Sequence, residues 1–250
     1  MTKKDRMAVG LHSHNNKTPT SVPVIRWYIT VLAFVVGGLW AYPYLSGCVG
    51  FKCPQETMVD SYSVWVKPSA SSRTGQRLLG VIKDLAADYN AYTFEPHVTV
   101  LAGIGGPQEA VLAAVEQASK QLAPTDYRFS QVKSGTFYFQ CVFLLVQASA
   151  EVHRAHQVTK SALLKQGVAL HLPNPEYMPH LSLLYADLDE DVKLGIAEKL
   201  GHGSEGEQLL AEGFQAMSLV VLRTDPSDKQ MTSWEQIAEF PLSGTSLTGH

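Results

Sequence analysis

The sequence predicts a domain of alternating strands and helices that follows one membrane-spanning segment. Three observations lead to this prediction. Short segments with strand and helix periodicities alternate over residues 60–241. Hydrophobic residues make up 45% of the chain, which is enough to build a core. Residues 27–45 carry no charged side chain. At 250 residues, the chain is long enough for one large domain or two small ones.

The N-terminal region predicts a tail, a membrane anchor and a linker. Residues 1–26 are polar and basic and predict a disordered tail, and residues 46–59 predict a linker. Residues 27–45 have about the length of a membrane-spanning helix, with tryptophan and tyrosine at both ends, as at membrane interfaces. Because five lysines and arginines precede this segment and only Lys52 follows it closely, we expect a single-pass membrane protein with a cytosolic N-terminus.

Other interpretations of this region stay open. Its shortage of acidic residues also suits an organellar transit peptide, and the mature protein would then be organellar or, after removal of the leader, cytosolic. Residues 45–48 resemble a bacterial lipoprotein processing site, although the segment before them is long for one. Cys48 and Cys53 form either a disulfide or two free thiols, and Cys141 lies in an apolar run that is typical of a core.

The first half of the domain predicts strand, helix, strand and helix. Residues 62–66 are rich in β-branched and aromatic side chains and predict a strand. Residues 74–90 predict a helix because their apolar side chains recur at helical spacing. A strand follows at residues 96–100. Residues 107–122 predict a second helix, with proline at its first position.

The second half continues this alternation. We expect a hairpin of residues 127–132 and 136–146 that turns at the Lys-Ser-Gly sequence 133–135. The other expected elements are a helix at 150–166, a loop at 171–177, a strand at 179–183, a helix capped by Asp189 that ends near 200, a glycine-rich acidic loop at 201–208, closing strands at 214–223 and 233–240, and a loose tail at 242–250.

Two five-residue motifs repeat one pattern 83 positions apart. Residues 96–100 read Pro-His-Val-Thr-Val, and residues 179–183 read Pro-His-Leu-Ser-Leu. In a strand, side chains two residues apart share one face, so each motif presents an imidazole and a hydroxyl together and turns two aliphatic side chains toward a core. One such motif would mean little, but the second copy matches in the proline, the hydroxyl and both aliphatic positions.

Two imidazoles and two hydroxyls that face one groove would form a binding site for a phosphate. His97 and His180 are suited to take and give protons, because the pKa of imidazole lies near neutrality. Thr99 and Ser182 are suited to donate hydrogen bonds to phosphoryl oxygens. The sequence does not indicate which histidine is the base and which is the acid.

A metal centre, a cofactor site and a nucleic-acid surface are all disfavoured. Zinc sites need three or four ligands, and the remaining candidates, His153, His156 and His171, come without a carboxylate or cysteine motif. The sequence has no P-loop, nucleophile elbow or dinucleotide-binding motif, so we expect no cofactor and no metal. After residue 53, acidic residues exceed basic residues by eight, whereas long nucleic acids are held mainly by basic surface. We expect a monomer that binds a small substrate and no long nucleic acid.

With both motifs in view, the chain resembles the two-histidine (2H) phosphoesterases, and in particular the cyclic phosphodiesterases of plants and fungi. The similarity covers about residues 60–240. It includes the segments 62–65, 135–145, 177–185 and 224–235. The resemblance implies a bilobal α+β fold, with two antiparallel sheets around a central groove, outer helices and one histidine motif from each lobe.

The resemblance also implies metal-independent hydrolysis of cyclic phosphates. The implied substrates are ADP-ribose 1″,2″-cyclic phosphate, opened to ADP-ribose 1″-phosphate, and nucleoside 2′,3′-cyclic phosphates, opened to 2′-phosphates. Both would arise as by-products of tRNA splicing. Tyr185 would join the phosphate site if a bulge or the strand end turns it there from the opposite face. Phe139 would either stack on the base or fill the core.

Two alternatives stay open. An RNA 2′-5′ ligase or RNA-end-processing member of the superfamily would need basic surface, which the acidic domain does not offer. A non-catalytic nucleotide-binding module would be expected to lose one of the histidines or hydroxyls of the two motifs, and this chain keeps all four.

Overall fold

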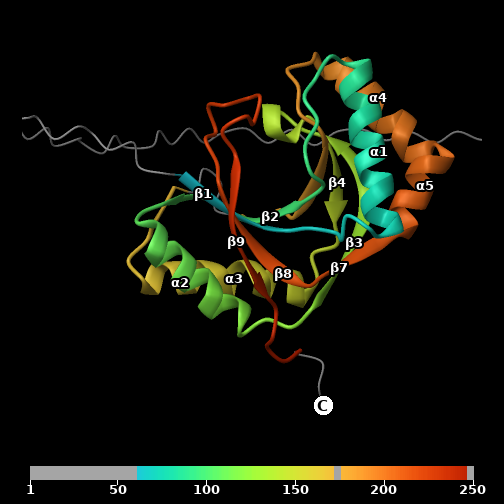
Figure 1. Cartoon of the computed structure of the whole chain (residues 1–250). Helices are drawn as coiled ribbons and strands as arrows, with labels where there is room; N and C mark the ends of the chain where they lie inside the picture. Colours follow the sequence, from blue (N-terminus) through green and yellow to red (C-terminus); the bar gives the residue numbers. More distant parts are fainter. Residues whose placement is uncertain (1–60, 172–175, 247–250) are drawn as a thin grey trace, which may run out of the picture. The chain divides into compact units, whose positions relative to one another are not determined.

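The computed structural model describes residues 61–171 and 176–246. Its strands form one antiparallel sheet that curls strongly (Figure 1), in the order β7-β3-β4-β6-β2-β1-β8-β9, with β5 paired to β2. The strands are β1 (Ser61–Val66), β2 (Val98–Gly105), β3 (Thr125–Ser134), β4 (Val142–Val146), β5 (Ala169–Leu170), β6 (His180–Leu184), β7 (Gly213–Ala216), β8 (Ser218–Arg223) and β9 (Glu235–Pro241).

The sheet consists of two halves that meet at β2 and β6. The pairing of these two strands is a single residue pair, Val98 with Leu181, whereas β6 pairs with β4 over four residue pairs and β2 with β1 over five. The α+β class is confirmed, but the expectation of two separate sheets is wrong, because this pair joins the halves. Each half carries one histidine motif: His97 directly precedes β2, and His180 begins β6.

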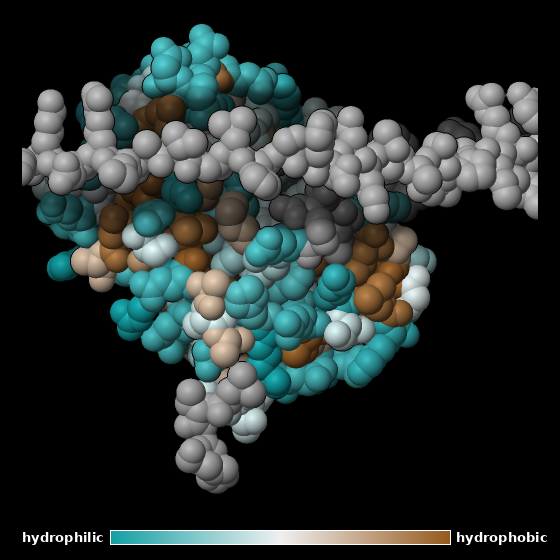
Figure 2. Space-filling view, turned by 180° about the vertical axis from the view of Figure 1, so that it is seen from behind, coloured by the Kyte–Doolittle hydropathy of each residue, from teal (hydrophilic) through white to brown (hydrophobic). Residues whose placement is uncertain are grey.

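The helices lie on the outside of the curled sheet (Figure 1). They are α1 (Arg73–Asp88), α2 (Gln108–Ser119), α3 (Ala150–Lys165), α4 (Glu190–His202) and α5 (Ser204–Ala211). Helices α2 and α3 contact each other and cover β2, β8 and β9, while α1, α4 and α5 contact β3, β6 and β7. In the view of Figure 2 most of the surface is hydrophilic, with hydrophobic residues in separate patches.

The aliphatic residues of the two histidine motifs lie in the core. Val98, Val100, Leu181 and Leu183 are fully buried, as the strand periodicity predicts. Burial of one such side chain stabilises the fold by about 1.5–3 kcal/mol, so the core strongly favours this orientation of both strands. The opposite face of each motif, which carries the imidazole and the hydroxyl, is therefore turned away from this part of the core.

The predicted hairpin is confirmed by the pairing of β3 with β4, but its second strand is shorter than predicted. Strand β4 begins at Val142, and the residues before it form a loop that contains a short 3₁₀ helix, η1 (Tyr138–Gln140). The amide of Gly135 donates a 3.0 Å hydrogen bond to the carbonyl of Cys141, and a Cβ at Gly135 would clash with the carbonyl of Gln140. Glycine at position 135 thus lets the chain turn back closely against Gln140 and Cys141. The apolar residues that follow Gly135 predict a continuous strand and give no sign of this turn.

Three smaller expectations also need correction. The predicted loop at 201–208 is mostly helix, because α5 follows α4 after one residue; a Cβ at Gly206 would overlap the carbonyl of Leu200, so this glycine allows close packing of the two helices. Pro107 is the N-cap of α2, with φ −60° and ψ 133°, rather than its first helical residue. The strand predicted at 214–223 is divided at Met217 into β7 and β8.

No helix within residues 61–171 and 176–246 combines the length and the apolar character that a membrane span requires. The predicted span at residues 27–45 lies outside the described residues, together with the tail, the linker, Cys48 and Cys53. The predictions for these segments stay predictions.

Candidate active site

One cavity of about 1000 Å³ collects every site residue predicted from the sequence. Its lining includes His97, Thr99, Phe139, His180, Ser182 and Tyr185. These residues come from both halves of the sheet, so the fold brings the two histidine motifs to one space. The volume lies at the upper end of the range of small-molecule sites in proteins.

The imidazole of His97 is held through its Nδ1 atom. Nδ1 lies 2.6 Å from the backbone carbonyl of Glu95, and because a carbonyl only accepts, Nδ1 carries the proton and donates. The Nε2 atom then has a free lone pair, and the hydroxyl of Tyr185 lies 3.4 Å from it and donates. His97 is 4% exposed. The backbone thus holds Nδ1, and Nε2 is the ring nitrogen that is turned toward Tyr185.

His180 is held in the same way in the other half of the sheet. Its Nδ1 donates to the carbonyl of Met178 at 2.9 Å, and the amide Nε2 of Gln140 lies 3.5 Å from its ring Nε2. His180 is partly exposed, whereas His97 is buried. The two imidazoles therefore share one tautomer and differ in their access to solvent.

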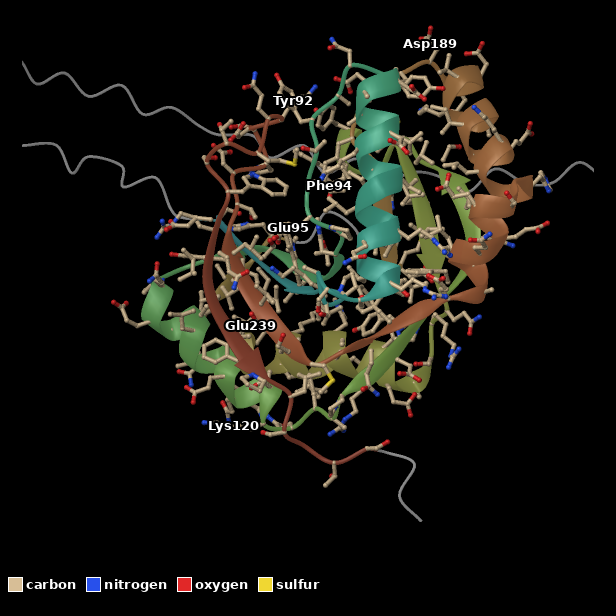
Figure 3. The ribbon with its side chains drawn as sticks, turned by 45° about the vertical axis from the view of Figure 1, so that its right-hand side comes forward. Tyr92, Phe94, Glu95, Lys120, Asp189 and Glu239 are labelled. Atoms are coloured by element: carbon tan, nitrogen blue, oxygen red, sulfur yellow. The ribbon has the colours of Figure 1, made fainter. Side chains whose placement is uncertain are left out.

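The proline of each motif accounts for this shared arrangement. In both motifs the accepting carbonyl belongs to the residue directly before the proline, two positions before the histidine. Proline disfavours a helical conformation at the preceding residue and fixes its own φ angle, so it helps to hold the carbonyl beside the imidazole. Figure 3 places Phe94 and Glu95 on the segment that leads from α1 into β2. The repeated proline was visible in the sequence, but its role was not recognised there.

Burial keeps both histidines neutral in the free protein. It lowers the pKa of His97 to about 3, with smaller effects from the Glu95 carbonyl, which raises the pKa, and from His180 and Lys67, which lower it. Burial also lowers the pKa of His180, against the effect of its hydrogen bond to Met178. An anionic phosphate between the rings would oppose these shifts, because a negative charge stabilises an imidazolium.

The two motif hydroxyls line the cavity at different depths. Ser182 is 5% exposed and its Oγ donates a 2.9 Å hydrogen bond to the carbonyl of Phe139, which ties β6 to η1. Thr99 is partly exposed, and its backbone carbonyl accepts a 3.3 Å hydrogen bond from the hydroxyl of Tyr177. Both residues line the same cavity as the two histidines.

Tyr185 follows β6, which ends at Leu184 after its register against β4 shifts at Leu183. Its ring stacks on Phe94 with centroids 3.8 Å apart, and its hydroxyl lies beside His97 of the opposite half. Burial raises the pKa of Tyr185, and a hydrogen bond with Ser182 lowers it, so the phenol stays protonated and can donate. The strand end and the register shift beside it, the two routes expected from the sequence, both lie next to Tyr185, which contacts His97.

Aromatic side chains form one wall of the cavity. Phe139 lies in η1 rather than in a strand, and its ring centroid is 5.2 Å from that of Tyr185, with the rings nearly perpendicular, and 5.4 Å from that of Trp234. Trp65 stacks on His97 and contacts Trp234 edge to face. Trp65 and Trp234 were not among the site residues predicted from the sequence. Trp65 lies two residues after Ser63 in a predicted strand, so the two side chains share one face, and both line the cavity. This shared face was the sequence signal for Trp65.

The other histidines considered as zinc ligands do not gather around an ion. Nδ1 of His156 donates to the carbonyl of Val100 at 2.8 Å, and the ring stacks on Tyr177. His153 meets the same tyrosine edge to face, and His171 lines the cavity. Among the residues that the structure describes, no three His, Cys, Asp or Glu side chains are arranged to hold a metal ion.

Known proteins resemble this chain in sequence and in fold. The family model of "cyclic phosphodiesterase-like protein" matches residues 58–242. The cyclic phosphodiesterase of Arabidopsis thaliana is 33% identical over 189 residues, which cover 76% of this chain and 99% of that protein. The 2′,3′-cyclic-nucleotide 3′-phosphodiesterase of Phaeosphaeria nodorum is 27% identical over 202 residues, which cover 72% and 98%.

Among solved structures, apo LigT of Escherichia coli covers 74% of this chain and 98% of its own, with a TM-score of 0.51 at 10% identity. TT0787 of Thermus thermophilus gives the same TM-score at 12% identity, covering 74% and 100%. At this identity the structures show a shared fold alone. The family match and the Arabidopsis relative go further: this chain belongs to the cyclic phosphodiesterase-like family of the 2H phosphoesterase superfamily.

Proposed function

We propose that this protein opens nucleoside 2′,3′-cyclic phosphates to 2′-phosphates and ADP-ribose 1″,2″-cyclic phosphate to ADP-ribose 1″-phosphate. Family membership makes it a cyclic phosphodiesterase, and the name of the Phaeosphaeria relative refers to 2′,3′-cyclic nucleotides. The observation that carries the proposal is the pair of imidazoles, each held through Nδ1 so that Nε2 is left for the chemistry.

The reaction needs one base and one acid on opposite sides of the phosphorus atom. Water attacks phosphorus and gives its proton to the Nε2 atom of one neutral imidazole. The bond from phosphorus to the leaving sugar oxygen breaks, and the other imidazole, protonated at Nε2, gives its proton to that oxygen. Because His97 and His180 are both neutral in the free protein, the anionic substrate itself would favour protonation of one ring.

The hydroxyls would stabilise the charge that develops on the phosphoryl oxygens. Thr99 and Ser182 each offer one O–H, and Tyr185 offers a third from beside His97. In the free protein the hydroxyl of Ser182 donates to the carbonyl of Phe139 and that of Tyr185 donates to His97. Substrate binding would replace these hydrogen bonds with hydrogen bonds to the phosphate. We assign Phe139 to the base of the nucleotide, because its ring shares the aromatic wall with Trp234.

Hydrolysis by the full-length protein in EDTA tests the proposal. We expect 2′,3′-cyclic AMP and ADP-ribose 1″,2″-cyclic phosphate to be consumed, with 2′-AMP and ADP-ribose 1″-phosphate identified by chromatography against standards. Loss of activity on chelation, restored by one divalent ion, would contradict the metal-independent reaction. Joining of RNA ends would favour the ligase alternative, and binding without turnover would favour a nucleotide-binding module.

The biological setting is also a proposal. By-products of tRNA splicing are the expected source of these cyclic phosphates, and residues 27–45 are expected to anchor the protein in a membrane. The two expectations are compatible if the catalytic domain faces the compartment that contains the substrate.

A further inference from the structure

Strand β2 is paired with β1 along its length, but on its other edge it is paired only near its two ends. On one edge it pairs with β6 at Val98 and with β5 at Ile104 and Gly105. On the other edge its register with β1 shifts between Thr99 and Leu101. A shift of this kind leaves one residue without an opposite partner. The sheet pairing of β2 is therefore incomplete between Val98 and Ile104, where other groups can satisfy its backbone.

Two side chains supply such partners. The hydroxyl of Tyr177 donates to the carbonyl of Thr99 at 3.3 Å, and Nδ1 of His156 donates to the carbonyl of Val100 at 2.8 Å. The two rings stack on each other, with centroids 4.2 Å apart and planes 12° apart. Both residues line the cavity. We call this pair, Tyr177 and His156, the wedge.

The wedge is connected to both histidine motifs. In the first motif it holds the carbonyl of Thr99. In the second, Tyr177 directly precedes Met178, whose carbonyl accepts the hydrogen bond from Nδ1 of His180. The motif strands share only the pair Val98 and Leu181 among their described residues, so the wedge adds a second connection between them.

The protonation states of the wedge suit this role. Burial raises the pKa of Tyr177 well above its ordinary value, so its hydroxyl stays a donor. Burial lowers the pKa of His156, and the nearby Lys160 and His153 lower it further, against the Val100 hydrogen bond. A neutral His156 with its proton on Nδ1 keeps the Val100 carbonyl satisfied across neutral pH.

We propose that Tyr177, supported by His156, is a positioning residue that fixes Thr99 relative to His180 and so sets the fit of the phosphate between the two motifs. The wedge takes no part in the acid–base steps. It would act through the placement of a hydroxyl that binds the phosphate, where a displacement of about 1 Å can cost about 100-fold in rate. This inference rests on the proposed function and on the role given there to Thr99.

A double-mutant cycle in the full-length protein separates positioning from general stabilisation. We expect Tyr177→Phe to lower kcat for a 2′,3′-cyclic nucleotide about tenfold, with a smaller effect on KM, because a misplaced hydroxyl weakens transition-state contacts most. In a Thr99→Ala background the same change should lower kcat less than about twofold, because residues that act through each other are not additive. Equal factors in both backgrounds would overturn the inference.

Two further variants make the cycle decisive. Tyr89→Phe removes a hydroxyl at the end of α1 that does not line the cavity, so kcat should not change. His156→Phe keeps a ring against Tyr177 but removes the donor to Val100, and it should also be non-additive with Thr99→Ala. If Thr99→Ala alone leaves kcat unchanged, the proposed phosphate role of Thr99 fails and this inference fails with it. If Thr99→Ala is impaired and both wedge variants are additive, the inference alone fails.

Discussion

The indole of Trp65 lies parallel to the imidazole of His97, with ring centroids 3.5 Å apart and planes 7° apart. In the proposed mechanism His97 carries a positive charge at one stage, either as the base after it takes a proton or as the acid before it gives one. The face of an indole attracts such a cation, by about 0.5–2 kcal/mol. Trp65 therefore buries the neutral ring and also stabilises its charged form.

Substitution of Trp65 should distinguish these two effects. We expect Trp65→Leu, which keeps an apolar contact but no π face, to lower kcat by about 3- to 30-fold, and Trp65→Phe to lose less. The measurement is steady-state hydrolysis of a 2′,3′-cyclic nucleotide, with thermal unfolding of each variant as the control. Equal losses in the two variants would show that the π face contributes nothing beyond packing.

Removal of either histidine should nearly abolish turnover. We expect His97→Ala and His180→Ala each to lower kcat by at least about 100-fold, because each ring makes one of two proton transfers in a single transition state. The double variant should be little worse than either single one. His202→Ala, at the exposed end of α4, is the matched control and should keep normal activity. A single variant with near-normal kcat would rule out the paired mechanism.

The histidine pKa values predict that kcat/KM falls as pH rises through neutrality. This constant reports the ionisation of the free enzyme, which needs one protonated and one neutral imidazole. Burial lowers the pKa of His97 to about 3 and also lowers that of His180 from its ordinary value, so above pH 6.5 the protonated acid becomes steadily scarcer. We expect log kcat/KM to decline with a slope near −1 between about pH 7 and 8.5. A flat profile over this interval would show that the acid is already protonated in the free enzyme.

The orientation of both motifs could be predicted because strand periodicity is a local property. The alternation of Val98 with Thr99, and of Leu181 with Ser182, already separates a core face from a site face. The conformational preference of proline is local as well. Its effect on the imidazole tautomer depends on where the carbonyls of Glu95 and Met178 lie, and only the structure shows this.

Contacts between distant segments could not be derived in this way. The stack of Trp65 on His97 depends on the register of β1 against β2, which places Trp65 opposite Thr99 across a register shift. The approach of Tyr185 to His97 depends on the end of β6 and on the register shift between β6 and β4 just before it. Phe139 was expected in a strand because its neighbours are apolar, but the turn at Gly135 places it in η1.

The predicted anchor can be tested without changing the catalytic domain. If residues 27–45 span a membrane, the full-length protein should stay in the membrane pellet after carbonate extraction. Val35→Arg with Val36→Arg keeps the length of the segment but places two charges at its centre, each of which disfavours insertion by about 2.5–3.5 kcal/mol. The double variant should appear in the supernatant with normal activity, because both substitutions lie far before the first residue of β1.

The orientation of the anchor needs a separate measurement. The excess of lysine and arginine before residue 27 predicts that the C-terminal domain crosses the membrane, so an engineered Asn-X-Thr site near residue 246 should be glycosylated in microsomes. A protein that stays in the pellet without this modification would contradict the orientation and leave the anchor standing. It would also place the phosphodiesterase domain on the cytosolic side, where cyclic phosphates from RNA processing could reach it. Release of the unaltered protein by carbonate would contradict the anchor itself.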